Sequence, residues 1–239
     1  MRISLSKKFL FFIYIFILGG LILTVFAGNK AVTVLSEKAP LTGRSCVIID
    51  AGHGGVDGGA TSCTGILESE INLEIALRLD DLMHLMGLDT VMTRTADLSI
   101  HTQGQTIAAK KVSDLKNRVQ IVNREQNALL ISIHQNYFED SRYSGAQVFY
   151  APTSDSNTFA RSLQTSFVNT LNPGSNRKAK KASGIYLMEH INCTGVLIEC
   201  GFLSNYEEEA KLCNADYQKQ ICAVIASQAS CYLQPKPAA

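Results

Sequence analysis

Residues 46–60, CVIIDAGHGGVDGGA, join a short apolar run to a loop in which five glycines surround a single histidine, His53. The run is rich in β-branched residues, which favours a strand that ends at the glycine loop. Glycine is placed where the backbone takes a positive φ or closely approaches another group. The loop is therefore expected to surround a bound object, either a phosphate group or a metal ion.

The rest of the chain alternates strand-like apolar runs with amphipathic helical patterns. Helices are expected at 71–86, 113–126 with Ser113 as N-cap, 157–171, and 206–233 with a break near Asn214. Further strands are expected at 88–93, 128–134, 145–150, 184–188 and 195–199. This alternation predicts an α/β fold: a three-layer sandwich with a mostly parallel mixed sheet flanked by helices. The polar segment 95–112 has no clear period and is expected to be a functional or mobile loop.

The first residues differ in character from the remainder. Arg2, Lys7 and Lys8 precede an uncharged apolar run, 9–28, which is long enough to span a bilayer. Cationic residues stay on the inner side, so the following domain is expected outside the cytoplasm. The cues for cleavage conflict, and both a signal peptide and a membrane anchor remain open. The predicted organisation is this segment at 1–28, a linker at 29–43, a single α/β domain at 44–234 and a tail at 235–239.

Charge and cysteine content narrow the classes of partner. A net charge of +1 gives no field that would favour nucleic acid. The basic run 177–181 is most simply a solvated face, although it could contact an anionic polymer. Seven cysteines leave at least one thiol outside any intrachain disulfide, and the absence of a CxxC pair argues against a structural zinc knuckle.

Ligands of α/β sheets bind at the carboxyl ends of the strands, where this sequence places several reactive side chains. These are His53, Arg94, His134 and Glu199. Glu68 follows His53 by 15 residues, just ahead of the first predicted helix. Two histidines and a carboxylate form a common ligand set for catalytic zinc, and a second carboxylate is then free to move protons. Each has an ordinary alternative: a loop histidine, a histidine at the core edge, or an acidic helix start.

The phosphate interpretation fits less well. The glycines around His53 do not reproduce the GxGxxG spacing, and no Gly-Lys-Ser/Thr sequence follows them. A nucleotide site would also leave His134 and Glu199 unexplained. The sequence therefore favours a metal ion.

Six motifs occur in order along the chain: IIDAGHGGVDGGA, LESEINLEIALRL, MTRTAD, LLISIHQN, SGAQVFY and GVLIECGFLSN. Together they closely resemble the zinc-dependent N-acetylmuramoyl-L-alanine amidases of bacterial cell walls. The resemblance implies that His53, Glu68 and His134 bind one Zn²⁺ per chain and that Glu199 is the catalytic acid and base. Arg94 and Asn136 are expected to orient ligands or to hold substrate carboxylates.

The chain departs from the commonest family pattern at Ala51, Gly58 and Ser69, none of which supplies a metal ligand. An N-terminal apolar segment, the 95–112 insertion and the stretch NRKAKKASGIYLMEH are similar to the sporulation and germination-specific subgroup. That subgroup implies a peptidoglycan substrate, cleavage that prepares muramic-δ-lactam in the spore cortex, and a location between the forespore membranes. A membrane contact through the N-terminal segment and a regulatory protein partner are also expected.

Two alternative functions remain open on the sequence. One is a zinc carboxypeptidase that acts on the stem peptides of the cell wall. The other is a catalytically silent peptidoglycan-binding protein that keeps the fold, against which the retention of all four His and Glu residues argues.

Overall fold

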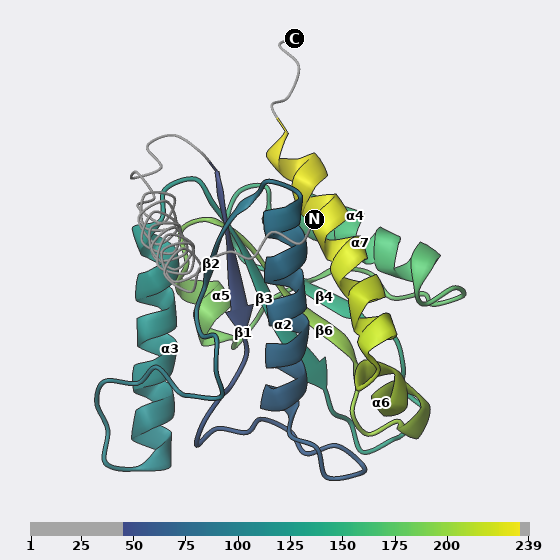
Figure 1. Cartoon of the computed structure of the whole chain (residues 1–239), viewed down its shortest axis with the longest axis horizontal. Coiled ribbons are helices and arrows are strands. Elements are labelled where there is room, and N and C mark those ends of the chain that lie inside the picture. Colours follow the sequence, from purple (N-terminus) through teal and green to yellow (C-terminus); the bar gives the residue numbers. More distant parts are fainter. Residues whose placement is uncertain (1–44, 235–239) are drawn as a thin grey trace, which may run out of the picture. The chain divides into compact units, whose positions relative to one another are not determined.

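The computed structural model describes residues 45–234 (Figure 1). The predicted N-terminal segment, the linker and the tail at 235–239 lie outside these residues. Within the described part, no helix combines the length and the apolar character that a membrane crossing requires.

The centre of the fold is a six-stranded sheet with the order β2-β1-β3-β6-β4-β5. Its strands are β1 (Cys46–Ala51), β2 (Asp89–Met92), β3 (Ala128–Asn136), β4 (Gln147–Tyr150), β5 (Lys180–Lys181) and β6 (Thr194–Phe202). β4 runs antiparallel to β6, and every other neighbouring pair is parallel. The predicted mixed, mostly parallel sheet is confirmed.

Helices cover both faces of the sheet. They are α2 (Glu68–Leu85), α3 (Ile107–Arg124), α4 (Ser156–Thr170), α5 (Tyr186–His190), α6 (Tyr206–Leu212) and α7 (Ala215–Leu233). α2 and α7 pack side by side on one face, together with α4 and α6, whereas α3 and α5 pack on the other (Figure 1). The three-layer α/β sandwich is thus as predicted.

Alternation along β1 divides its side chains between the two layers. Val47, Ile49 and Ala51 join the core under α2 and α7, while Ile48 joins the core under α3. All are fully buried, and complete burial of such a side chain stabilises a fold by about 1.5–3 kcal/mol. Asp50 shares the side of Ile48 because side chains alternate along a strand, and it therefore carries a carboxylate into the layer of α3.

One predicted strand was wrong, and one short strand was not predicted. The expected strand at 184–188 is largely replaced by helix α5, whose adjacent Leu187 and Met188 are both buried. Short apolar runs do not distinguish a buried strand from a buried helical turn. The small strand β5 was not predicted.

The predicted N-terminus of the helix at Ser113 was also wrong. α3 begins at Ile107, and Thr106 caps it by accepting a hydrogen bond from the amide of Ala109. Ser113 lies inside the helix, where its hydroxyl accepts from the amides of Thr102 and Gln103 and ties the preceding loop to α3. The first turns of α3 lack apolar periodicity because they face solvent.

Candidate metal centre

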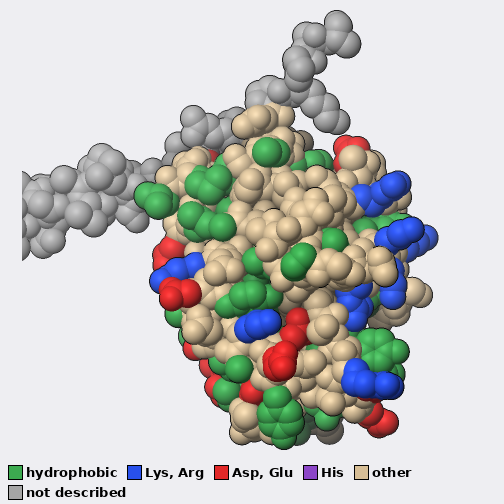
Figure 2. All heavy atoms as spheres, turned by 90° about the vertical axis from the view of Figure 1, so that its right-hand side faces the viewer, with side chains coloured by type: hydrophobic (Ala, Val, Ile, Leu, Met, Phe, Trp, Pro, Cys, Tyr) green, Lys and Arg blue, Asp and Glu red, His purple; other side chains and the backbone are tan. Residues whose placement is uncertain are grey.

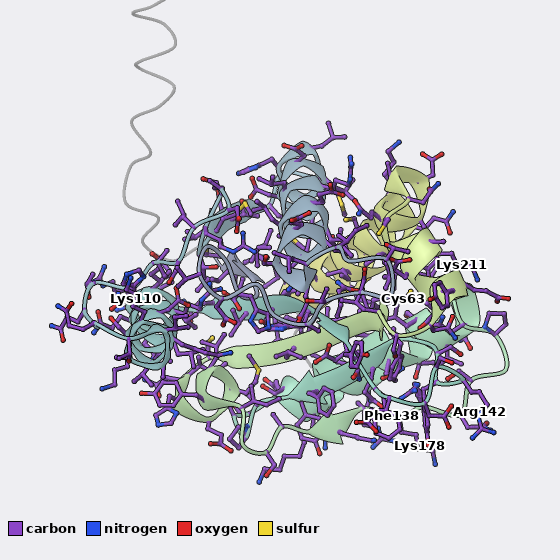
Figure 3. The ribbon with its side chains drawn as sticks, turned by 90° about the horizontal axis from the view of Figure 1, so that it is seen from below. Cys63, Lys110, Phe138, Arg142, Lys178 and Lys211 are labelled. Carbon is purple, nitrogen blue, oxygen red and sulfur yellow. The ribbon has the colours of Figure 1, made fainter. Side chains whose placement is uncertain are left out.

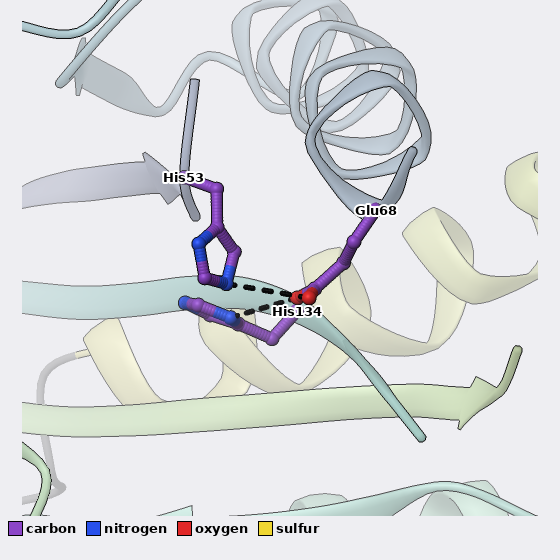
Figure 4. A group of neighbouring side chains, drawn as sticks. All are labelled: His53, Glu68 and His134. Carbon is purple, nitrogen blue, oxygen red and sulfur yellow. Dashed lines mark hydrogen bonds and ion pairs between the residues drawn. The ribbon is translucent and has the colours of Figure 1, made fainter. Parts of the chain in front are cut away.

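Three side chains from distant parts of the sequence converge at the carboxyl edge of the sheet (Figure 4). His53 follows β1, Glu68 is the first residue of α2 rather than a residue ahead of it, and His134 lies in β3. One ligand atom from each lies within 4.8 Å of the others. Because β1 and β3 are adjacent and parallel, their ends meet at the same edge and bring both imidazoles together.

Glu68 lies between the two imidazoles. Its Oε1 is 3.0 Å from Nδ1 of His134, and its Oε2 is 3.3 Å from Nε2 of His53. The backbone amides of Ala60 and Gln135 also donate to this carboxylate. Burial alone would raise the pKa of Glu68, but the hydrogen bonds and charges of the two histidines hold it well below its usual range. The carboxylate is therefore ionised and ready to bind a cation.

His53 is oriented by a carboxylate of its own loop. Its Nδ1 lies 3.0 Å from Oδ2 of Asp57, which also forms an ion pair with Lys111. A carboxylate at one ring nitrogen fixes the imidazole and directs the other nitrogen toward a metal. Burial lowers the pKa of His53, but Asp57 and Glu68 outweigh it and raise the value to about 9. Here Nε2 is the nitrogen that faces Glu68.

The glycines leave room for these side chains. A Cβ at Gly52 would overlap the imidazole of His134. A Cβ at Gly59, where φ is +70°, would lie 2.5 Å from Oε2 of Glu68. Both positions therefore require glycine, because the side chains of the predicted ligands fill the space beside the loop.

Glu199 lies in β6 at the position that pairs with His134 of β3. Its Oε2 is buried and has no hydrogen-bond partner among the residues that the structure describes. Burial and the charge of Glu68 raise the pKa of Glu199 to about 7, although His134 and His53 oppose this change. A carboxyl group with a pKa near neutrality beside two histidines can both accept and donate a proton.

The donor set and the surrounding space suit a metal ion. Two imidazole nitrogens and a carboxylate oxygen form the ligand set of many catalytic zinc sites, and the unpartnered Glu199 suits a proton-transfer role beside it.

Residues 47–229 match the Amidase_3 family, described as N-acetylmuramoyl-L-alanine amidase. The chain belongs to this family. It is an enzyme of the class that hydrolyses the amide between N-acetylmuramic acid and L-alanine in peptidoglycan.

Individual relatives agree with this assignment. The amidase is 37% identical to a germination-specific N-acetylmuramoyl-L-alanine amidase of Bacillus subtilis. The alignment spans 188 residues and covers 78% of each chain. It is 28% identical to the amidase LytC of the same organism, over 79% of this chain and 35% of LytC. Among solved structures, the CwlD amidase of Clostridioides difficile, in complex with the GerS lipoprotein, superposes with a TM-score of 0.75. That match has 37% identity and covers 79% of this chain and 98% of CwlD.

The buried side chain of Arg94 links the glycine-rich loop after β1 to α2. It is 3% exposed, and its guanidinium donates to the carbonyls of Ala51, Gly52 and Ser69. It thereby joins the end of β1 to the first turn of α2, next to the predicted ligands. These contacts fit the expected role in orienting ligands, and its contact with substrate stays a prediction.

Sequence reasoning missed a second buried arginine, Arg118 of α3. Its guanidinium contacts the carboxylates of Asp50 and Asp114 and donates to the carbonyl of His53 at 2.7 Å. Asp50 in turn accepts from Ser132 and holds β1 to β3. Two features of the sequence could have pointed to Arg118: the acidic Asp50 in an otherwise apolar strand, and the spacing of four residues between Asp114 and Arg118. The contact of Asp57 with His53, four residues before it, was also missed.

Asn136, the other residue predicted to hold substrate, follows His134 by two residues. Asn136 ends β3, where its backbone carbonyl accepts from the amide of Leu203. Its side chain is half-buried, and its role toward substrate stays a prediction. A cavity of about 220 Å³ opens beside the cluster, lined by residues that include His53, Asp57, Lys111, His134, Tyr186 and Leu197. This cavity gives the two predicted histidine ligands access to solvent and to a reactant.

Proposed function

We propose that this amidase binds one Zn²⁺ through His53, Glu68 and His134 and uses Glu199 as the acid and base of peptidoglycan hydrolysis. The observation that supports this most is the convergence of the three predicted ligands beside Glu199, whose buried Oε2 has no hydrogen-bond partner among the described residues. The reaction is hydrolysis of the amide that joins the lactyl group of N-acetylmuramic acid to L-alanine. A zinc ion held by these residues supplies Lewis acidity to the scissile carbonyl and makes water at the site more acidic.

Side chains of the protein itself transfer the proton and position the ligands. Glu199 accepts the proton of the attacking water and delivers it to the leaving amine of L-alanine. Asp57 keeps Nδ1 of His53 occupied so that Nε2 faces Glu68. Arg94, Arg118 and Asn72 fix the backbone and carboxylate that carry the ligands, because each of them donates to Gly52, His53 or Glu68. Asn136 is the residue that we place next to the substrate, whereas the buried Arg94 orients the ligands.

We further place the reaction in the synthesis of the spore cortex, where it prepares muramic-δ-lactam needed for germination. The similarity to a germination-specific amidase of Bacillus subtilis supports this role. The activity lies outside the cytoplasm, with the segment at 1–28 as export signal or anchor. The complex of CwlD with a lipoprotein in Clostridioides difficile supports the expectation of a protein partner.

Product identification tests the proposal. The full chain, loaded with zinc in detergent, is incubated with purified peptidoglycan, and the products are identified by mass spectrometry. We expect released peptides with a free L-alanine amine and glycan strands with bare muramic acid. Release of single C-terminal amino acids would instead indicate a carboxypeptidase, and stoichiometric zinc without any product would indicate a silent binding protein. Spores without this gene are expected to lack muramic-δ-lactam.

A further inference from the structure

A basic pocket lies at the edge of the sheet formed by β4 and β5. It is an open surface depression of about 550 Å³, and its lining includes Arg142, Tyr143, Gln147, Arg177, Lys178 and Lys180. We infer that this basic pocket binds the terminal carboxylate of the substrate's stem peptide. The inference rests on the proposed function, because it assigns a binding site to the part of the substrate that leaves.

The sheet register connects the basic pocket to the proposed reaction centre. His134 of β3 pairs with Glu199 of β6, and Glu199 pairs with Gln147 of β4. The side-chain amide of Gln147 donates to the carbonyl of Lys178 at 2.8 Å, just before β5. Paired residues project to the same face of a sheet, so this row leads directly from the predicted ligands to the pocket.

The span of this row matches a short peptide. Neighbouring strands lie about 4.8 Å apart, which puts the backbone of Lys178 roughly 10 Å from that of Glu199. An extended peptide advances about 3.3–3.6 Å per residue, so about three residues cover the same distance. A stem peptide whose first residue is cleaved beside Glu199 would therefore place its third or fourth residue at the basic pocket.

The charge of the pocket is not neutralised from within. Within residues 45–234, no carboxylate lies at ion-pair distance from Lys178, Lys180 or Arg177. The Cζ of Arg177 lies 4.9 Å from the centroid of the Phe202 ring, and its Nε–H donates to the carbonyl of Ser144. Arg142 is exposed, and its ion pair is with the half-buried Asp140. Figure 2 shows basic side chains gathered along the right-hand edge of that view, and such a surface favours an anionic ligand.

An aromatic pair borders the basic pocket. Phe138 and Tyr143 meet edge to face with their ring centroids 4.9 Å apart, and they are 50% and 48% exposed. Phe138 follows His134 by four residues, beyond the end of β3. Figure 3 shows Phe138, Arg142 and Lys178 near one another on one side of the molecule, with Lys110 at the opposite side. The aromatic pair offers apolar contact for an alkyl side chain of a peptide whose carboxylate reaches the cations.

Lys178→Ala with Lys180→Ala tests the inference, because both side chains are exposed and the double variant is expected to fold. The matched control is Lys116→Ala with Lys219→Ala, which removes the same charge from α3 and α7. Each protein is assayed on muramyl substrates that carry L-alanine alone, a four-residue stem with a free carboxylate, and the same stem as a carboxamide. We expect the pocket variant to raise KM for the carboxylate stem about three- to tenfold, with kcat unchanged. The other two substrates and the control variant should show no such change.

Equal KM values of the unaltered protein for the carboxylate and carboxamide stems would overturn the inference. So would an equal loss by the double variant on all three substrates. Binding of the free stem peptide to the zinc-loaded Glu199→Gln protein, followed by calorimetry, tests the pocket even if no substrate is cleaved. If no substrate is cleaved, the proposed function is wrong, but peptide binding that depends on Lys178 and Lys180 still supports the assignment of the pocket. Binding of polyphosphate that equals or exceeds peptide binding would make the surface a general polyanion site and overturn the peptide assignment.

Discussion

Glu199 and His134 occupy paired positions on the adjacent parallel strands β6 and β3. Backbone hydrogen bonds of the sheet therefore set the spacing between the proposed proton carrier and a proposed metal ligand. The register shifts just after this pair, and the amide of Gln135 in the irregular segment donates to Glu68. The end of one strand thus aligns three of the four residues that the proposed chemistry requires.

Glu199→Gln is expected to abolish proton transfer and to keep the metal. The amide has nearly the same shape but cannot accept a proton at neutral pH, and loss of such a group lowers rates by about 10²–10⁴-fold. Zinc content by elemental analysis and peptide release from peptidoglycan are measured on the same sample. Glu207→Gln, which changes an exposed carboxylate of α6, is the matched control. Turnover within tenfold of the unaltered protein would remove Glu199 from the proposed role.

Zinc binding is expected to strengthen as pH rises. Without metal, the pKa of His53 is about 9, so at pH 7 the imidazole carries a proton that zinc must displace. The apparent affinity should increase about tenfold per pH unit between pH 7 and 8.5 and level off above 9. Competition with a chromophoric chelator measures this dependence. An affinity independent of pH over that range would contradict a protonated His53 in the metal-free protein.

Asp57→Ala is expected to weaken zinc binding about 10–100-fold, because it removes the acceptor at Nδ1 that orients His53. The loss should persist above pH 9, where competition from the proton has ended. Asp81→Ala removes an exposed carboxylate from α2 and should leave the affinity unchanged. If both variants bind zinc equally well, the contact between Asp57 and His53 does not orient the ligand.

Much of the sheet, and the strand ends that carry the candidate site, could be predicted from the sequence because both leave signals within a few neighbouring residues. An apolar run that ends in a reactive side chain marks the carboxyl edge of a parallel sheet, which is how His53 and His134 could be placed together. Arg118 could not be assigned its contacts with His53 and Asp50, since contacts across 65 or more residues leave no periodic trace in one sequence. Asp57 lies only four residues from His53, but a loop has no regular period that would show which of its side chains meet. Helix α5 was missed because five residues are too few to establish a helical period.

Gly52→Ala is expected to prevent metal binding without unfolding the protein. Its backbone does not need a positive φ, but the added Cβ would overlap the ring of His134 and displace it from Glu68. Gly58→Ala is the control, because its Cβ would meet only the flexible end of Leu67 at 3.1 Å. We expect zinc loss in the first variant alone, with similar circular dichroism for both. Full zinc occupancy in Gly52→Ala would show that His134 is not held where a metal requires it.

Acid is expected to destabilise the protein through the buried pair of Asp50 and Arg118. Burial raises the pKa of Asp50, but the Arg118 guanidinium and the hydroxyls of Ser132 and Thr93 lower it from 3.8 to about 2. The unfolded chain therefore binds the proton more readily, and the stabilisation, present above pH 4, is lost as pH falls toward 2. It amounts to about 2 kcal/mol. Urea unfolding between pH 5 and pH 2.5 measures it in the unaltered protein and in Asp50→Asn, with Asp81→Asn, which changes an exposed carboxylate of α2, as control. Asp50→Asn should be less stable at pH 5, since Arg118 loses its buried partner, and its free energy of unfolding should fall less steeply with acid. Parallel pH profiles for all three proteins would show that this pair does not contribute to acid sensitivity.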